Sequence, residues 1–254
     1  MNPISVAIIT YNEEKNIEKC LQSVMGIADE IIIVDSFSTD NTLKIAEKFN
    51  AKIYSKEFLG YAEQKNLANQ NCTHELILSL DADEVLSTEL YQSIKKVKEN
   101  LNADAYELKR LTNYAGKWVK HCGWYPDKKI RLFKKSKAHW AGPKLHEILV
   151  LTNDAKIKTL NGDLLHYSFH SEEDHLKQID KFTNISSEEL FNKGKKSSAY
   201  HLYLKPILRF FTDYIIKLGI LDGATGYTVC KNSAYAAYLK YYKLKKLWNE
   251  HRTS

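Results

Sequence analysis

Short apolar runs alternate with helical segments through the first hundred residues of the chain, and this alternation limits the folds that it can adopt. The strand-type runs are SVAIIT, EIIIVD, AKIYSK and ELILSLD. The segments between them show helical spacing or helix-capping residues, as in NEEKNIEKCLQSVMGI, STDNTLKIAEKFN and GYAEQKNLANQNC. Strands that alternate with helices in this way predict a mostly parallel sheet that is covered on both faces.

Three of the predicted strands lead into clusters of polar residues. The clusters are TYNEE at 10–14, DSFSTD at 35–40 and DADE at 81–84. In parallel sheets of this type, ligands bind at the carboxyl ends of the strands. The three clusters are therefore the first candidate for a functional site.

The second half of the chain has a different sequence pattern. Three strand-type runs within residues 103–170 predict that the sheet becomes mixed, and these runs are AYELKRL, KIRLFKK and KTLNGDLLHYSF. An aromatic and basic loop, NYAGKWVKHCGWYPDKK, separates the first two runs. From about Ser171 the pattern is helical to the end. A length of 254 residues suffices for one large domain or for a domain with an appendage.

The positive charge of the chain is concentrated in its C-terminal tail. Residues 193–254 contain 12 Lys and Arg against 3 Asp and Glu, a net charge of +9, whereas residues 1–192 carry a net charge of −3. A basic tail favours an anionic partner, either nucleic acid or acidic lipid headgroups. The tail contains no recognisable nucleic-acid-binding module, so nucleic acid is not an expected partner.

Cysteine spacing and the N-terminus indicate the cellular compartment. The four cysteines lie far apart without a CxxC pair, which argues against a disulfide framework or a zinc ribbon and fits a reducing cytosol. The first residues, MNPISVAIIT, have neither a basic leader nor a cleavage site. We therefore expect no signal peptide and a cytoplasmic protein.

Asp81 and Asp83 come at the end of the fourth predicted strand, and three interpretations of this acidic pair are open. The pair could cap the next helix, although Ser87 is better placed for that role. It could also be the first motif of a haloacid-dehalogenase-like phosphatase, whose later motif would have to be Gly162 and Asp163. Alternatively, it could bind Mg²⁺ or Mn²⁺ against a nucleotide diphosphate, because these ions prefer oxygen ligands and keep positions open for phosphate.

Four stretches resemble family 2 glycosyltransferases with the GT-A fold, in the order expected for that family. They are VAIITYNEEKNIEKCLQSV, EIIIVDSFSTDNT, GYAEQKN and ILSLDADE. Later stretches resemble bacterial lipopolysaccharide core β-1,4-glucosyltransferases, namely GWYPDKKIRLFKK, KLHE, LLHYSF and GILDGATGY. The resemblance implies a Rossmann-like α/β fold of the GT-A type, with a mixed central sheet and a C-terminal helical appendage.

The resemblance also implies different roles for three segments of the chain. Residues 1–100 would form a nucleotide-sugar-binding half, residues 101–192 the acceptor-side half of the same GT-A domain, and residues 193–254 C-terminal amphipathic helices. The implied reaction is inverting transfer of a sugar, glucose from UDP-glucose, to a lipopolysaccharide inner-core or similar cell-surface acceptor. A haloacid-dehalogenase-like phosphatase and a non-catalytic nucleotide or sugar binder with this fold remain as alternatives.

For the donor, the resemblance assigns residues in each polar cluster. It places the nucleoside among Thr10, Tyr11, Asn12 and Glu13, and it makes Asp35 the acceptor for the uracil N–H, with Ser38 in the same turn. Lys65 falls near the phosphates, where relatives often carry Arg. Capping of the following helices is the plainer interpretation of Asn12, Glu13 and Asp35, and an inert exposed lysine is the plainer interpretation of Lys65.

For the metal and the chemistry, the resemblance names five residues. Asp83 would bind Mg²⁺ or Mn²⁺, Asp81 would lie beside the ribose and the metal, and His166 is the candidate for a further metal ligand. Asp127 is the expected catalytic base and Glu147 its rival, although Asp127 could simply be a turn residue after a proline. Aromatic residues nearby could cover sugar rings, or be core, and these are Trp118, Trp124, Tyr125 and Trp140.

The tail predicts amphipathic helices rather than a membrane span. In the stretch 202–221, charged residues recur every four positions and form one polar stripe on an otherwise apolar helix: Lys205, Arg209, Asp213 and Lys217. Apolar side chains around Phe210, Phe211, Ile215 and Trp248, with Lys240, Lys243 and Lys246, could pack on the core or lie in a membrane interface. We expect peripheral binding to the inner face of the cytoplasmic membrane, where a lipid-linked acceptor would be found.

Overall fold

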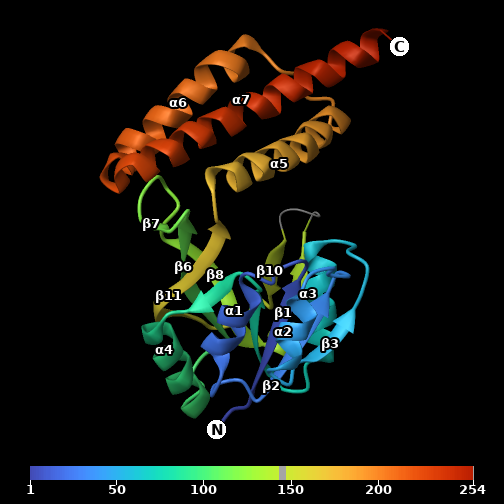
Figure 1. Cartoon of the computed structure of the whole chain (residues 1–254), viewed down its shortest axis with the longest axis vertical. Coiled ribbons are helices and arrows are strands. Elements are labelled where there is room, and N and C mark those ends of the chain that lie inside the picture. The colour runs from blue at the N-terminus through green and yellow to red at the C-terminus, as the bar shows by residue number, and fades with distance from the viewer. Residues whose placement is uncertain (143–146, 254) are drawn as a thin grey trace. The chain divides into compact units, whose positions relative to one another are not determined.

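The first half of the chain forms the alternating strands and helices that its sequence predicts (Figure 1). The structure is a computed structural model that describes residues 1–142 and 147–253. Its first elements are β1 Ile4–Thr10, α1 Ile17–Val24, β2 Glu30–Asp35, α2 Thr42–Glu47, β3 Lys52–Ser55, α3 Tyr61–Asn71, β4 Leu76–Asp81, β5 Glu84–Leu86 and α4 Thr88–Glu99. Strand β5 was not predicted, because three residues are too few to show an alternating pattern.

The second half forms further strands and then helices, again as predicted. Its elements are β6 Ala105–Tyr114, β7 Lys117–Val119, β8 Asp127–Lys134, β9 Ala138–Ala141, β10 Ile148–Leu151, β11 Ile157–Phe169, α5 Glu172–Asn192, α6 Lys205–Phe211 and α7 Gly223–Thr253. Short 3-10 turns cover Lys135–Lys137 and Gly219–Asp222, and π-helical turns cover Tyr200–Leu204 and Thr212–Ile216. The short strands β7, β9 and β10 were not predicted.

The central sheet is mixed, in agreement with the sequence. Its strands follow the order β3-β2-β1-β4-β8-β6-β11-β5, and β7 pairs with β6 beside this path. The first four strands in this order are parallel, whereas β8 is antiparallel to both β4 and β6. Strands β9 and β10 form a separate antiparallel pair.

Alternate residues of β1 face opposite sides of the sheet and build two separate cores. Val6 and Ile8 are fully buried on one side, in a cluster that includes Leu21 of α1. Ala7 lies on the other side, in a cluster that includes Ala68 of α3. Helices therefore cover both faces of the parallel strands, which explains why the strands are apolar at nearly every position.

The register of the parallel strands brings the three polar clusters to one edge of the sheet. Thr10 at the end of β1 pairs with Asp35 at the end of β2, and Ile9 pairs with Asp81 at the end of β4. The carboxyl ends of these strands carry the first, second and third clusters. The three clusters thus meet at one edge of the sheet, as the sequence predicts.

The chain divides into two compact units. One consists of Met1–Arg110 and Asp127–Tyr167, and the other consists of Leu111–Pro126 and Ser168–Ser254. These boundaries follow packing, so the functional segments 1–100, 101–192 and 193–254 stay a prediction about roles. Every candidate donor, metal and base residue lies in the first unit.

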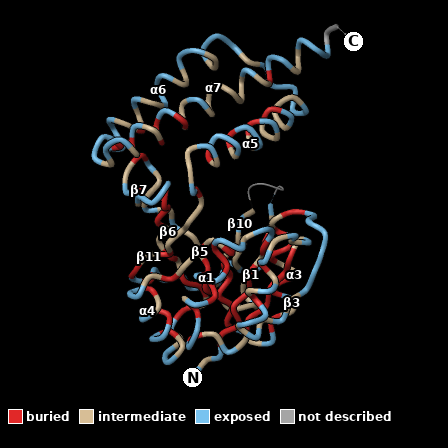
Figure 2. The backbone as a smooth tube through the Cα atoms, in the orientation of Figure 1, coloured by how far each residue is buried: buried red, intermediate tan, exposed pale blue. Residues whose placement is uncertain are grey.

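The second unit is built around α7, which packs against both α5 and α6. Its apolar core includes Tyr114, Phe169 and Val229. Figure 2 shows the buried residues along α5 and α7, whereas no residue of α6 itself is buried. Among the described residues, no helix is both long and apolar enough to cross a membrane.

Candidate active site

The turns that follow β1 and β2 interlock. The backbone N–H of Asn12 donates to the Ser38 hydroxyl at 2.8 Å, and the backbone N–H of Thr39 donates to the Asn12 side-chain oxygen at 2.8 Å. Asn12 has a φ of 54°, in the left-handed region that asparagine adopts more readily than most residues. The first two polar clusters therefore form one continuous surface.

Asp35 is fully buried at the end of β2. One of its carboxylate oxygens accepts from the backbone N–H of Ser38 at 2.9 Å, and the other accepts from the Ser38 hydroxyl at 2.5 Å. Asp35 is not the cap of the following helix, because the N-cap position of α2 is Asn41. The carboxylate instead fixes the turn that carries Ser38.

Three side chains next to these turns could contact a ligand. Thr10 is buried, and its hydroxyl oxygen has no hydrogen-bond partner among the described residues. Tyr11 and Phe37 are 58% and 59% exposed. A buried hydroxyl without a partner and two exposed rings are groups that a bound base can satisfy. Phe37 was missed in the sequence because a single aromatic residue in a polar turn has no spacing signal.

Glu13 belongs to the same turn and also to the acidic end of β4. Its backbone N–H donates to the Thr42 hydroxyl at 2.8 Å, and its carboxylate accepts from the Asn16 side chain at 2.8 Å. Burial, and then the negative charge of Asp83, raise the pKa of Glu13 to about 7. The position of Glu13 therefore disfavours its charged form, mainly because the carboxyl group is buried.

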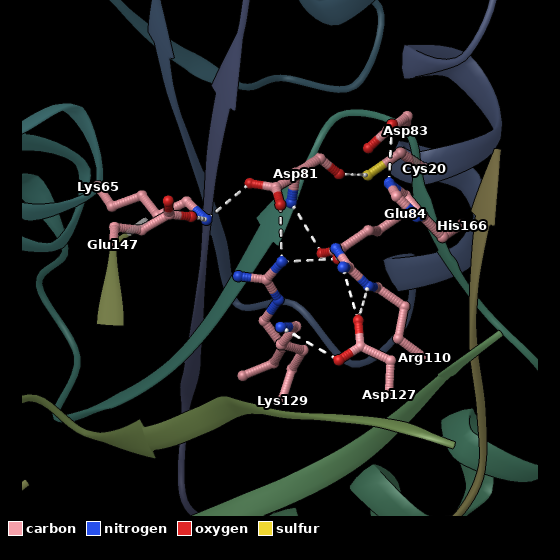
Figure 3. Close-up of polar contacts among 11 residues, drawn as sticks. Cys20, Lys65, Asp81, Asp83, Glu84, Arg110, Asp127, Lys129, Glu147 and His166 are labelled. Carbon is pink, nitrogen blue, oxygen red and sulfur yellow. Dashed lines mark hydrogen bonds and ion pairs between the residues drawn. The ribbon is translucent and has the colours of Figure 1, made fainter. Parts of the chain in front are cut away.

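Asp81 is held between two cations (Figure 3). Its Oδ1 lies 2.9 Å from Lys65 Nζ, and its Oδ2 lies 2.6 Å from an Arg131 nitrogen. Burial would raise the pKa of Asp81, but Arg131 and then Lys65 outweigh it and hold this pKa far below its usual value. Lys65 is only 1% exposed, so the alternative of an inert exposed lysine is wrong.

Glu84, the last residue of the DADE cluster, is fully buried and links the cations of the site. Its Oε1 lies 2.6 Å from Arg131 and 3.4 Å from Arg110, while its Oε2 accepts from the backbone N–H of Asp81 at 3.0 Å. None of these three links was predicted. The only sequence signal for Glu84 is its place in the acidic cluster, since β6 and β8 supply its partners from far along the chain.

Asp83 pairs with His166. The sequence prediction makes both residues ligands of one metal ion, which requires that they lie close together. Asp83 Oδ2 lies 3.1 Å from His166 Nε2. The antiparallel pairing of β5 with β11 sets His166 opposite Glu84 and so brings the imidazole to the acidic cluster. Burial would lower the pKa of His166, but Asp83 raises it above its usual value; burial would raise the pKa of Asp83, but His166 lowers it.

The helix-capping interpretation of the acidic pair is wrong. The N-cap of α4 is Ser87, whose hydroxyl accepts from the backbone N–H of Leu90 at 3.2 Å. The Ser87 hydroxyl also accepts from the backbone N–H of Asp163 at 3.0 Å. The Gly-Asp pair of the phosphatase alternative is therefore part of the packing around this cap.

A divalent cation fits the Asp83–His166 pair only if the substrate supplies further ligands. In residues 1–142 and 147–253 there is no group of three or more His, Cys, Asp or Glu side chains arranged to hold a metal. Mg²⁺ commonly binds through one or two protein ligands together with substrate phosphates. Asp83 and His166, 3.1 Å apart, would supply the protein ligands of such a partial site.

Asp127 begins strand β8 and is paired in register with Arg110 of β6, so it is more than a turn residue. Its Oδ2 accepts from Arg110 Nε at 2.9 Å and from Arg110 Nη2 at 2.6 Å. Its Oδ1 lies 3.1 Å from Lys129 Nζ. Burial would raise the pKa of Asp127, but Arg110 and Lys129 lower it below its usual value.

Glu147, the rival base, lies at the other end of the same set of charges. Its Oε1 is 2.9 Å from Lys65 Nζ. A continuous series of ion pairs therefore joins Glu147 to Asp127 by way of Lys65, Asp81, Arg131, Glu84 and Arg110 (Figure 3). Lys144 and His146, part of the KLHE stretch of the family resemblance, lie outside the described residues.

Two of the predicted sugar-covering aromatics are structural. Trp140 is buried on β9, with Lys65 Nζ 4.6 Å from its ring centre, and packs against Phe133. Trp124 packs edge-on against Tyr114 within the second unit. Trp140 is a core residue and Trp124 is partly buried against the core of the second unit, in agreement with the plainer of the two interpretations.

Comparison with known proteins decides the family. Residues 5–148, more than half of the chain, match the model of Glycosyl transferase family 2. The chain belongs to glycosyltransferase family 2. An uncharacterized glycosyltransferase of Rickettsia typhi is 35% identical to this glycosyltransferase over 97% of the chain and 88% of its own length. The predicted family is thereby confirmed, and the phosphatase alternative is dropped.

The chain is also similar to a curated glycosyltransferase and to a solved structure. The lipopolysaccharide core biosynthesis glycosyltransferase LpsC of Rhizobium meliloti is 25% identical over 93% of this glycosyltransferase and 90% of its own length. The mannosyltransferase PcManGT of Pyrobaculum calidifontis, solved with GDP-Man and Mn²⁺, superposes with a TM-score of 0.54 at 15% identity, over 98% of this chain and 88% of its own. The GT-A fold predicted for this glycosyltransferase is confirmed.

Proposed function

We propose that this family 2 glycosyltransferase moves glucose from UDP-glucose, with inversion at the anomeric carbon, to the inner core of lipopolysaccharide or a similar cell-surface glycan. One observation carries the proposal. The acidic end of β4 is neutralised on several sides, and it adjoins the two interlocked turns at the ends of β1 and β2. Such an edge suits a ligand with a base at one end and a diphosphate at the other.

The donor nucleoside would occupy the surface of the interlocked turns. The free hydroxyl of Thr10 and the exposed rings of Tyr11 and Phe37 would contact the base, while Asn12 and Ser38 hold the turns in register. Asp35, which already accepts two hydrogen bonds from Ser38, would also accept from the uracil N–H. Lys65 would reach the diphosphate from its place beside Asp81.

Asp83 and His166 would hold Mg²⁺ or Mn²⁺ together with the diphosphate, and Asp81 would lie beside the ribose. When bound, this ion supplies positive charge that stabilises the departing UDP. Asp81 itself is engaged by Lys65 and Arg131, so its contribution to the cation would be indirect. The 3.1 Å contact between Asp83 and His166 supports a cation in this place, as does the charge of Asp83, which adds to burial in raising the pKa of Glu13 to about 7.

Asp127 is our choice for the catalytic base. It would take the proton of the acceptor hydroxyl while that oxygen attacks the anomeric carbon and the bond to UDP breaks. Its side chain is 32% exposed and stays within reach of an acceptor, even though Arg110 and Lys129 contact its oxygens. Glu147, which is fixed to Lys65, remains the competing candidate.

Two observations support the proposed acceptor. The relative LpsC is named for lipopolysaccharide core biosynthesis, and the later motifs of this chain resemble the core β-1,4-glucosyltransferases. Such an acceptor is anchored in lipid, so the enzyme would act at the inner face of the cytoplasmic membrane without crossing it. A panel of nucleotide sugars, tested with lipid-linked core oligosaccharide and analysed by mass of the product, tests the proposal. Transfer from another nucleotide sugar alone would refute the donor, and no transfer from any would refute the function.

Asp83→Ala should remove the metal dependence of UDP binding. In the wild type, calorimetry should show tighter UDP binding with Mn²⁺ than with a chelator, because the ion at Asp83 offsets the diphosphate charge. In the variant the two affinities should be equal. Asp154→Ala removes an exposed carboxylate of the same unit and should behave like the wild type. UDP binding that stays equally strong and metal-dependent in Asp83→Ala would disprove the metal assignment.

Asp35→Ala should weaken UDP binding by about 1–3 kcal/mol, the cost of losing a charged hydrogen-bond partner. Because Asp35 also fixes the turn, Ser38→Ala serves as the comparison: it disturbs the same turn and leaves the carboxylate in place. The affinity for UDP and the affinity for free pyrophosphate are measured in each variant in the presence of Mn²⁺. Equal losses for UDP and pyrophosphate, or equal losses in both variants, would contradict a specific contact with uracil.

A further inference from the structure

The charged residues of the segment that contains α6 find their partners within their own unit. Asp213 is fully buried between Arg209 and Lys217, with its Oδ1 2.9 Å from Lys217 Nζ. Lys205 Nζ donates to the Tyr241 hydroxyl of α7 at 2.8 Å. Lys205 of the stripe is thus bonded to α7, and Asp213 pairs with Arg209 and Lys217 of its own segment.

The opposite side of the same segment is apolar and exposed. We call it the α6 outer surface, and its residues are Tyr203, Leu204, Ile207, Leu208, Phe211, Ile215, Ile216, Leu218, Ile220 and Leu221, each close to half exposed or more. The last five are concentrated in the corner between α6 and α7, where their exposed fractions are 51%, 75%, 50%, 51% and 64%. A surface helix in water normally buries its apolar side and exposes its polar side. This segment exposes its apolar side, while Asp213 of its polar side is buried, and such an exposed apolar surface suits an apolar neighbour.

Cations surround this surface. Arg209 and Lys217 are 47% and 41% exposed at the side chain, and Lys120, on a loop of the same unit, is exposed. The backbone N–H of Cys122 donates to the carbonyl oxygen of Lys217 at 3.1 Å, which ties that loop to the corner. Residues 193–254 together carry a net charge of +9. Apolar side chains bordered by cations match an anionic lipid interface, where the former enter the acyl boundary and the latter meet headgroup phosphates.

We propose that the α6 outer surface docks into the headgroup and upper acyl region of an anionic lipid bilayer. A second copy of the chain is the competing occupant, but a symmetric contact would bring two strongly positive segments together. A corner of five protruding aliphatic side chains also suits a soft medium, which needs no matching shape. Docking would bring the enzyme to the lipid-linked acceptor of the proposed function, yet the docking itself does not depend on that function.

The structure changes which residues we expect to meet the membrane. Lys243 donates to the Asp180 carboxylate at 2.6 Å and to the Thr183 hydroxyl at 2.9 Å, so it serves the packing of α7 on α5. The Trp248 ring nitrogen donates to the carbonyl oxygen of Lys195 at 2.7 Å, and Phe210 packs into the core of the unit. These residues of the sequence prediction belong to the fold of the second unit. Of the apolar residues that the sequence prediction placed at the membrane, Phe211 and Ile215 remain on the α6 outer surface.

The test is co-sedimentation of the full chain with vesicles. Wild type should bind phosphatidylglycerol–phosphatidylcholine vesicles at low salt, less at high salt, and bind weakly to phosphatidylcholine alone. Ile216→Ser with Leu221→Ser should lower partitioning by roughly a hundredfold, since burial of each aliphatic side chain is worth about a tenfold change. Met25→Ser with Ile157→Ser removes two comparably exposed aliphatic side chains from the first unit and should bind like the wild type.

Folding and function are followed separately on the same proteins. UDP affinity and circular dichroism should be equal in all of them, because the substituted side chains are exposed and lie outside the candidate active site. Vesicle binding in an enzyme that transfers no sugar would leave the docking intact and refute the proposed function alone. The docking is refuted if wild type ignores anionic vesicles, or if the corner variant binds them as well as wild type does. It is also refuted if wild type does not bind vesicles and light scattering shows that wild type is a dimer whereas the corner variant is a monomer.

Discussion

Asp127→Asn is expected to leave the affinity for UDP-sugar close to that of the wild type and to lower turnover by roughly 10²–10⁴, the range for loss of a general base. Arg110 and Lys129 hold the pKa of Asp127 below its usual value, so the carboxylate is ionised at neutral pH and can accept a proton. Asparagine keeps the size and can still accept a hydrogen bond from Arg110, but it cannot take the proton of the acceptor hydroxyl. Initial rates and donor binding, measured on the same preparation, check both halves of the expectation.

Glu147→Gln is the matched comparison, because Glu147 is the other carboxylate at the end of the ion-pair series. It should weaken the contact with Lys65 and alter donor affinity, while turnover at saturating donor stays within an order of magnitude of the wild type. The reverse result, with turnover kept in Asp127→Asn and lost in Glu147→Gln, would transfer the catalytic role to Glu147. Loss in both variants with unchanged donor affinity would mean that neither carboxylate acts alone.

Arg131→Met should destabilise the fold by about 3–5 kcal/mol, the typical cost of removing one partner from a buried ion pair. Arg131 is nearly fully buried and lies 2.6 Å from both Asp81 and Glu84, so methionine would fill much of the space and leave two carboxylates poorly compensated. Denaturant unfolding gives the measurement. Lys128→Met, on the same strand, breaks an exposed pair with Glu107 and should cost no more than about 1 kcal/mol.

The pH dependence of this loss has a definite sign. Arg131 holds the pKa of Asp81 below its unfolded value, so the stability that it provides is present above that value and disappears as the pH falls through the folded pKa. The difference between wild type and Arg131→Met should therefore shrink in acid. Adding Glu84→Gln to the variant should restore part of the stability at neutral pH, because it removes one of the stranded charges. Equal stability of Arg131→Met and wild type would show that the ion pairs contribute little.

The sequence alone determined the order of the longer strands and helices and the edge of the sheet at which the polar clusters meet. Apolar runs such as EIIIVD are strands because both of their sides are buried, and this leaves an unbroken pattern in the sequence. The polar clusters end these runs, and parallel pairing necessarily collects them at one edge. Ser87 was likewise visible as a helix cap, because capping depends on a few neighbouring residues.

The tertiary structure alone decided how the charges of the site are connected. Glu84 meets Arg110 and Arg131, and Asp83 meets His166, through pairings of strands that are distant in sequence. The short strand β5, which sets His166 in register, has too few residues to leave a pattern. Contacts of this kind depend on strand order and register, and a pattern within one segment contains no information about either.

The helix that contains Asp213 shows the same limit in one element. Its sequence determined that one side is charged and the other apolar, since a period of four residues places Lys205, Arg209, Asp213 and Lys217 together. It did not determine which side faces outward. Only the packing on α7 decided that, because Tyr241 and the paired cations satisfy the charged side within the unit. The apolar side was then left at the surface. The sequence could not show this, because helical periodicity defines the two sides of a helix but not the neighbour of either side.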